Sequence, residues 1–167
     1  MDASPAPQGP SEVLLTCKLF SGLREEELQA IQAIAHSRRF SASKQIFELG
    51  EPASTLFIIE SGQVALSLPL KIREVTRAVT IEQNEAGEVI AWSALVPPHK
   101  LTLSAVAVTD VSLLGLERTD LTELFQRQPR IHGVVASNLC AVIADRLSMF
   151  KALLLRDLQR WVAERHS

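Results

Sequence analysis

The segment FELGEPASTLFIIESGQV, residues Phe47–Val64, carries the pattern that decides the fold. Gly50–Pro52 and Ser61–Gly62 are turn signals, because glycine adopts positive φ and proline fixes φ. The stretch between them, Thr55–Glu60, is rich in β-branched and aromatic residues, which favour extended backbone. The segment therefore predicts a strand, a tight turn and a second strand.

Further short strands are expected on both sides of this segment, because a period of about two residues continues from His36 to Leu116. We expect strands at Arg38–Ser41, Gln45–Glu48, Thr55–Glu60, Gln63–Leu68, Ala78–Gln83, Val89–Trp92, Leu103–Val108 and Val111–Leu116. Eight strands at this spacing are typical of a jelly roll or a similar closed barrel.

Helices are expected before and after the strands. A short helix begins near Ser11, and a second helix follows the Ser21–Gly22 turn with glutamates in its first turn, where the helix dipole favours them. Arg118–Gln128 predicts another short helix, and residues 130–165 predict a long one with apolar residues at steps of three and four. The fold class is thus α+β: an eight-stranded jelly-roll-like β-barrel flanked by N-terminal helices and a long C-terminal helix.

The chain divides into three parts. Residues 1–10, MDASPAPQGP, are expected to form a disordered tail, because this proline-rich composition cannot hold a packed structure. Residues 11–129 form the barrel with its flanking helices, and residues 130–167 form the long helix. At 1.5 Å per residue that helix would reach roughly 50 Å, which is longer than the barrel can cover.

An apolar stripe along the long helix predicts a homodimer. The positions that approximate an a/d seam are Cys140, Ile143, Leu147, Phe150, Leu154 and Trp161, with Asp157 as an interruption. The alternative is that the stripe packs on the barrel of its own chain.

Composition limits the partners of the chain. With 167 residues, 47% of them hydrophobic and 22% charged, the sequence is that of one folded domain with an extension. A net charge of −2 gives no basic surplus, so no nucleic acid is expected as a partner. No apolar run is long enough to cross a bilayer and the N-terminus does not have a secretory pattern, so we expect no membrane partner and a cytoplasmic location.

No motif for catalysis or metal binding is found. Cys17 and Cys140 lie far apart, and we expect two reduced, buried and inert thiols. No metal-ligand spacing connects the histidines, which are His36, His99, His132 and His166. We therefore assign no catalytic and no metal-binding residues, and a cupin-like metalloenzyme is an unfavoured alternative.

The stretch GEVIAWSALVPPHKLTLSAVA, Gly87–Ala107, reads as a strand, a tight helical turn and a returning strand. Such a turn can direct free backbone N–H groups at an anion. With LFSGL, the Phe47–Val64 pattern and LLGLERTDLTELFQRQP, it makes Leu19–Leu147 resemble the cyclic nucleotide-binding domain family. The resemblance implies a barrel that binds cyclic AMP or cyclic GMP in this stretch, which we call the cassette, and transmits binding through its last helices.

The resemblance also implies which residues would contact the ligand. The family holds the ribose hydroxyl with a glutamate and the phosphate with an arginine. Trp92 stands at the glutamate position, Ala91 at the preceding glycine, and Leu101, followed by Thr102, at the arginine. Both directional contacts are therefore absent, and Trp92 would fill the space of the sugar if it pointed inward.

Other candidate contacts remain in the cassette. The backbone N–H groups of Trp92, Ser93 and Ala94 can still donate to a phosphate. Lys100 adjoins the arginine position, but neighbouring strand residues face opposite sides, so we expect it to point to solvent unless the register shifts by one residue. His99, beside two prolines, is expected to be a loop residue.

The sequence thus predicts a non-catalytic regulatory or sensor module with weak or lost cyclic nucleotide binding, which acts through its C-terminal helix. It requires no cofactor, and a small molecule remains a candidate ligand. The alternatives are a genuine cyclic AMP or cyclic GMP binder with a non-standard cassette, and a structural scaffold with an empty barrel. A stand-alone transcription factor is not expected, because no helix-turn-helix follows the long helix before Ser167.

Overall fold

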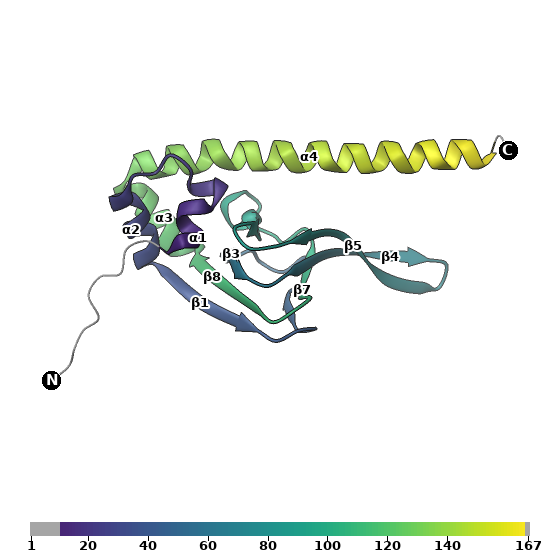
Figure 1. Ribbon diagram of the computed structural model, residues 1–167, viewed down its shortest axis with the longest axis horizontal. Coiled ribbons are helices and arrows are strands. Elements are labelled where there is room, and N and C mark those ends of the chain that lie inside the picture. The colour runs from purple at the N-terminus through teal and green to yellow at the C-terminus, as the bar shows by residue number, and fades with distance from the viewer. Residues whose placement is uncertain (1–10, 166–167) are drawn as a thin grey trace.

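The chain forms two four-stranded antiparallel sheets with helices at both ends (Figure 1). The computed structural model describes residues 11–165, with Ile72 described by its backbone alone, so the predicted tail at residues 1–10 lies outside the described residues. The strands are β1 (Ala35–Phe40), β2 (Gln45–Phe47), β3 (Thr55–Ser61), β4 (Val64–Ile72), β5 (Val75–Asn84), β6 (Val89–Ile90), β7 (Ser104–Ala107) and β8 (Val111–Glu117). The helices are α1 (Glu12–Thr16), η1 (Lys18–Phe20), α2 (Glu25–Ala33), η2 (Trp92–Leu95), α3 (Arg118–Arg127) and α4 (Pro129–Arg165).

The sheets form an open roll and not the closed barrel that the sequence predicted. Their strand orders are β1-β8-β3-β6 and β2-β7-β4-β5, and no ladder joins the two sheets among residues 11–165. Closure would require continuous hydrogen bonding at the sheet edges, where β2 has three residues and β6 has two. The α+β class is correct, and eight strands form near their predicted positions.

The core lies between the two sheets and beneath the helices. Strand β8 contributes four buried apolar side chains, at Val111, Leu113, Leu114 and Leu116. Helix α2 buries Leu28 and Ile31, which are three residues apart and so lie on one helical face. The buried face of α4 carries Ile131, Val135 and Leu139.

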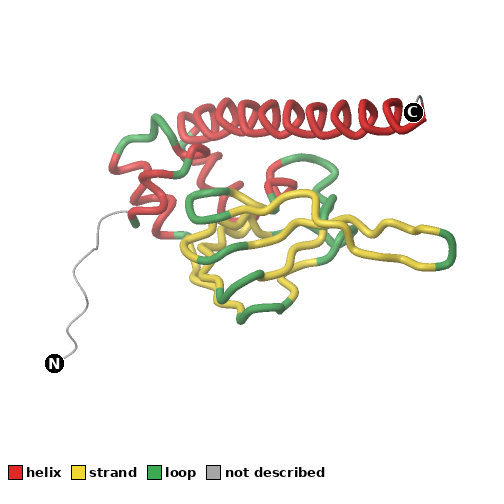
Figure 2. Tube along the Cα trace, turned by 45° about the vertical axis from the view of Figure 1, so that its right-hand side comes forward, coloured by secondary structure: helices red, strands yellow, loops and turns green. Residues whose placement is uncertain are grey.

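Helix α4 runs along one side of the roll and continues beyond it (Figure 2). Near its start it is attached through Asn138, whose amide donates to the Leu19 and Ser21 carbonyl oxygens at 3.0 and 2.8 Å. Cys140 is exposed, so the expectation of two buried thiols is wrong for this residue and correct only for Cys17. The physical reason is that Cys140 follows Leu139 on a helix of which only one face is covered.

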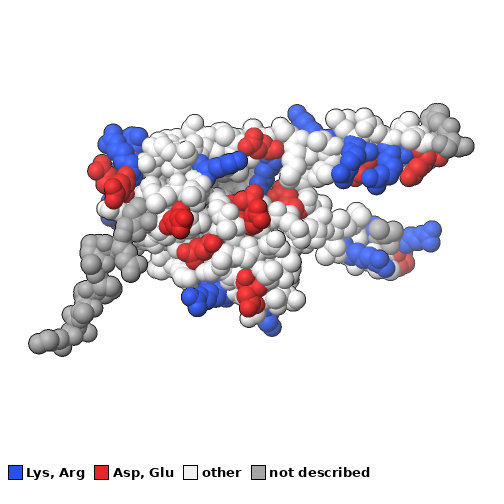
Figure 3. Space-filling view, viewed as in Figure 1, with Lys and Arg blue, Asp and Glu red and all other residues white. Residues whose placement is uncertain are grey.

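The distal half of α4 exposes its apolar side chains, which argues against packing of the stripe on the same chain. Leu147, Leu154, Leu158 and Trp161 are 54%, 61%, 48% and 51% exposed. The β4–β5 hairpin projects in the same direction, and the two form separate arms (Figure 3). This hairpin also carries exposed apolar residues, namely Leu68, Leu70, Val75 and Val79.

Candidate functional site

The cassette turn is the helix η2, which connects β6 to the loop before β7. Its N-cap residue, Ala91, has φ 58° and ψ 31°, a left-handed conformation that costs an L-residue about 1–2 kcal/mol. The first bond of the turn runs from the Ala94 N–H to the Ala91 carbonyl oxygen at 3.0 Å. The N–H groups of Trp92 and Ser93 therefore precede the first intrahelical bond, as at any helix N-terminus. The turn ends β6 two residues earlier than predicted, since Ala91 is left-handed and Trp92 is helical.

His99 fixes the end of this turn. Its Nδ1 lies 3.3 Å from the Ser93 carbonyl oxygen and 3.1 Å from that of Ala94, so Nδ1 carries the proton that is donated there. Its backbone N–H donates to the Val96 carbonyl oxygen, and its own carbonyl accepts from the Ala53 N–H. As expected, His99 is a loop residue, and its φ of 57° is left-handed.

Ala91 and Leu101 line one cavity of about 250 Å³. Leu101 is 7% exposed and is held by its backbone, which donates to the Glu51 carbonyl oxygen and accepts from the Gly50 N–H. The cavity is also lined by Phe47 and Phe57, whose rings stack with centroids 6.4 Å apart. Ligand pockets typically measure roughly 300–1,000 Å³, so this space is small, and Leu101 offers an anion only C–H groups.

Most of the other predicted contact residues lie away from this cavity. Trp92 is half-buried and packs against the core, but it is not among the described residues that line the cavity. Ser93 and Ala94 are buried, at 7% and 0% exposure. Lys100 and Thr102 are exposed, on either side of the buried Leu101. Of the predicted site residues, the structure thus brings together Ala91 and Leu101.

Arg38 is the basic residue in the lining of the cavity. Its guanidinium lies 3.6 Å from a carboxylate oxygen of Glu117, and its side chain is 55% exposed. The carboxylate of Glu51, also in the lining, accepts from the Glu48 N–H at 3.0 Å. Within residues 11–165, each of these two charges therefore already has a partner.

The sequence did not reveal the contact between Glu82 of β5 and Arg146 of α4. Their charged groups form an ion pair, and the side chains are 3% and 14% exposed. Arg146 also donates to the Val89 carbonyl oxygen at 2.9 Å, in the strand that leads into the cassette turn. The partners are 64 positions apart, so no local pattern could predict the pair. Helix α4 is thereby attached to the cassette strand.

Two further features bear on the class of the protein. Within residues 11–165, histidine, cysteine, aspartate and glutamate side chains form no group of three that could hold a metal ion. None of the described helices combines the length and the apolar character needed to span a bilayer.

An open two-sheet roll, a short helical turn inserted between its strands and a long helix after them define a β-roll domain. Residues 37–128 match the family model described as Cyclic nucleotide-binding domain. The chain therefore belongs to the cyclic nucleotide-binding domain family.

Relatives support this assignment and show how much of each protein the chain represents. The "Cyclic AMP receptor protein" of Thermus thermophilus is 35% identical over 129 residues, which are 77% of this chain and 56% of the relative. "Glutaminase 1" of Bradyrhizobium diazoefficiens is 29% identical over 80% of this chain, but the match is only 21% of that protein. The chain thus spans little more than half of the first relative and about a fifth of the second, and neither match gives it an enzymatic activity.

Solved structures share the fold. The Catabolite Activator Protein of Thermus thermophilus superposes with a TM-score of 0.69 at 31% identity, over 82% of this chain and 61% of that one. A cyclic nucleotide-binding domain from Methylobacillus flagellatus gives a TM-score of 0.71 at 22% identity, over 83% of this chain and 76% of that one. The second likeness concerns the fold alone.

Proposed function

We propose that this chain is a non-catalytic regulatory module with weak or lost affinity for cyclic nucleotides. The observation that carries the proposal is the cavity of about 250 Å³ beside Ala91, walled by Leu101 where the family carries its phosphate arginine. A charge-assisted hydrogen bond contributes roughly 1.5–3 kcal/mol, so the missing arginine alone weakens binding about 10- to 100-fold. Any remaining contact from the turn would come from the N–H groups of Trp92 and Ser93, because the predicted donor at Ala94 is already bonded to the Ala91 carbonyl oxygen and the predicted contacts Lys100 and Thr102 do not line this cavity.

Isothermal titration with cyclic AMP and cyclic GMP tests this proposal directly. We expect no saturable heat at micromolar nucleotide for the natural chain. The double variant Trp92→Glu/Leu101→Arg restores both directional contacts and should gain measurable affinity. The matched control Trp92→Gln/Leu101→Met introduces uncharged side chains in place of the glutamate and the arginine of the test variant. It should gain no affinity. Micromolar binding by the natural chain would contradict the proposal.

A genuine cyclic nucleotide binder with a non-standard cassette is the second candidate. The N–H groups of Trp92 and Ser93 at the start of η2 favour it, since the backbone donors of the cassette are retained. The similarity to a protein named Cyclic AMP receptor protein points the same way. The titration distinguishes the two candidates, because this one requires binding by the natural chain.

We further propose that α4 transmits the state of the cassette, with residues 11–129 as the sensing unit and 130–167 as the output. Arg146 supports this coupling, because it pairs with Glu82 and donates to Val89, two residues before Ala91. A movement of this strand would change the geometry of both contacts. Helix α4 would then shift relative to the roll.

The output surface that we propose is a homodimer through the exposed stripe of α4. Cys140, Leu147, Leu154 and Trp161 follow one another at seven-residue steps, which place them at one position of a heptad. In a parallel dimer the two Cys140 thiols would lie opposite each other. Mild oxidation should therefore give a disulfide-linked dimer that the Cys140→Ser variant does not form.

Light scattering provides the second test of the dimer. The variant Leu147→Glu/Leu154→Glu places charges in the seam and should halve the particle mass. The control Gln159→Glu adds a charge at an exposed site outside the seam and should leave the mass unchanged. An unaltered mass in the double variant would exclude the stripe as the contact.

A further inference from the structure

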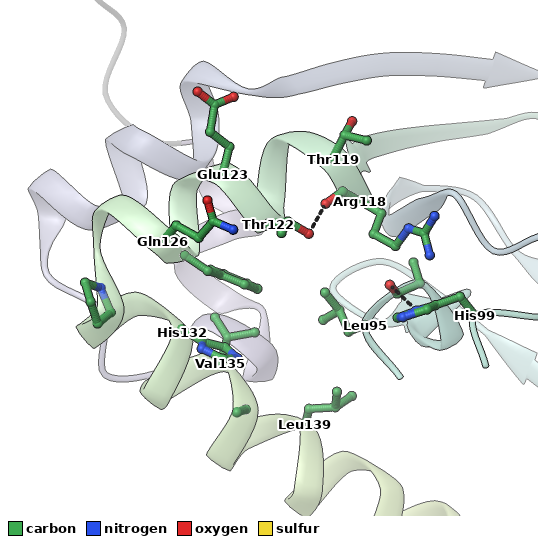
Figure 4. Close-up of a pocket in the computed structure, with 14 residues that line it drawn as sticks. Leu95, His99, Arg118, Thr119, Thr122, Glu123, Gln126, His132, Val135 and Leu139 are labelled. Atoms are coloured by element: carbon green, nitrogen blue, oxygen red, sulfur yellow. Dashed lines mark hydrogen bonds between the residues drawn. The ribbon is translucent and has the colours of Figure 1, made fainter. Parts of the chain in front are cut away.

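A groove of about 840 Å³ lies between η2, α3 and α4, separate from the cavity beside Leu101 (Figure 4). Its volume falls within the roughly 300–1,000 Å³ that is typical of small-molecule sites. Its apolar residues come from all three elements and include Leu95, Phe125, Val135 and Leu139. The groove therefore has an apolar floor that could receive a hydrocarbon or aromatic group.

Arg118 gives the groove an unpaired cation. Its backbone is fixed, since its N–H donates to the Ser54 carbonyl oxygen at 2.7 Å and its carbonyl accepts from the Thr122 hydroxyl at 2.7 Å. Its side chain is half-buried and extends toward the end of the groove where His99 lies (Figure 4). The guanidinium makes no hydrogen bond or ion pair within residues 11–165. A half-buried guanidinium is suited to bidentate binding of a carboxylate.

Among the charged residues that line the groove, Arg118 is the one whose side chain has no partner in the described part of the chain. Glu123 is the carboxylate among the residues that line it, and this carboxylate is neutralised by an ion pair with Arg127. The His99 ring is held by its Nδ1, which leaves a second polar atom, Nε2, without a partner in the described part of the chain. The His132 ring stacks on Phe125 at a centroid distance of 4.9 Å and extends the aromatic wall. The charge and the apolar floor together suit a single anionic group with an apolar body.

We propose that this groove binds a small amphipathic carboxylate, an aliphatic or aryl acid whose carboxylate pairs with Arg118. Its apolar part lies on the floor formed by Leu95, Phe125 and Leu139. Such a ligand touches the cassette turn and both C-terminal helices at once. It therefore provides a second input to α4 that does not depend on the binding of a cyclic nucleotide.

Isothermal titration of the full chain with octanoate tests the charge of the ligand. We expect one saturable site for octanoate and none for octylamine, which has a similar chain but the opposite charge. Arg118→Gln should weaken octanoate binding by about 10-fold or more, as loss of a charge-assisted contact predicts. Arg39→Gln removes an equal charge from the exposed side of β1 and should leave the affinity unchanged. Equal affinities for octanoate and octylamine would overturn the proposal, as would an unaffected Arg118→Gln variant.

Substitution of Ala136 tests whether the ligand lies in the groove. It lines the groove on the exposed side of α4, so substitution there should not disturb the fold. Ala136→Glu should abolish octanoate binding, because it adds a negative charge beside the carboxylate. Ala136→Gln adds a side chain of the same size without the charge and should weaken binding much less. Octanoate binding that Ala136→Glu leaves unchanged would place the acid outside the groove and overturn the proposal. The nucleotide titration described above fails or succeeds independently of these results.

Discussion

Arg146, in the middle of α4, forms an almost buried ion pair with Glu82 of β5, with side chains 14% and 3% exposed. One oxygen of the Glu82 carboxylate has no hydrogen-bond partner, so the pair is not fully satisfied. Removing one partner leaves an uncompensated buried charge, which typically costs about 3–5 kcal/mol. We expect Arg146→Met to lower the free energy of unfolding by that amount in urea titrations.

The double variant Glu82→Leu/Arg146→Met distinguishes loss of the pair from loss of packing. Replacement of both partners by apolar groups of similar size is often neutral or stabilising. The double variant should therefore be more stable than Arg146→Met alone. A double variant less stable than either single variant would show that the losses come from packing and not from the broken ion pair.

Glu27 should make the stability of the fold depend on pH in acid. Arg130 contacts its carboxylate, and the Arg24 N–H donates to it at 2.8 Å. These contacts, with Arg130 the larger cause, lower the pKa of Glu27 below its ordinary value of 4.5. Their contribution is complete above pH 4.5 and disappears as the pH falls through the lowered pKa of the folded state.

The variant Glu27→Gln should flatten the decline of unfolding free energy below pH 4.5. Glu26→Gln is the matched control, because that neighbouring side chain is 75% exposed and its ion pair with Arg24 is 3.6 Å long. Denaturation of all three proteins at several pH values measures the effect. If the natural chain and Glu27→Gln have parallel profiles, this carboxylate is not the source of the acid sensitivity.

Gly62 and Gly50 have nearly the same backbone conformation in different surroundings. Their φ values are 87° and 88°, but a Cβ on Gly62 would lie 2.3 Å from the Asp110 carbonyl oxygen, whereas nothing lies within 4 Å of one on Gly50. Gly50→Ala should cost about 1 kcal/mol for the left-handed backbone alone. Gly62→Ala should cost about 3 kcal/mol or more, because the clash adds to it. Urea titration compares the free energies of unfolding of the two variants. Equal decreases would show that the loop at Asp110 moves to accommodate the added Cβ without cost.

The two thiols should differ in reactivity. Cys17 is 1% exposed, and burial raises the pKa of its thiol, so little thiolate forms at neutral pH. Cys140 is exposed on α4. In the Leu147→Glu/Leu154→Glu variant, which cannot form the proposed dimer seam, a thiol reagent at neutral pH should modify Cys140 rapidly and Cys17 only after unfolding, as mass spectrometry of the labelled peptides can show. Rapid labelling of Cys17 in the folded chain would contradict its burial.

Much of the fold could be predicted from local patterns. The turn glycines and the apolar run of Phe47–Val64 specify a hairpin, because glycine permits positive φ and β-branched residues favour extended backbone. Comparison of the cassette sequence with the family pattern also identified Ala91, Trp92 and Leu101 as the residues that differ from the family at its ligand-contacting positions. Lys100 is exposed as expected, although it lies before β7 and not within a strand, and the neighbouring Leu101 is buried.

Other features depend on contacts between distant segments. The predicted barrel is an open roll, because closure is decided by the edges of β2 and β6 and not by the number of strands. The direction of Trp92 was left open by the sequence, since a helical turn in place of a strand end changes which way a side chain points.

The sequence by itself determined the family, the order of the elements and the absence of charge at the two cassette positions, since these follow from residue type and local backbone preference. Only the tertiary structure decided that Arg146 reaches Glu82 across 64 positions and that Arg118 is left unpaired above an apolar groove. Such pairings depend on how α3 and α4 pack on the roll, and the free energy of a charge is fixed by its neighbours in space.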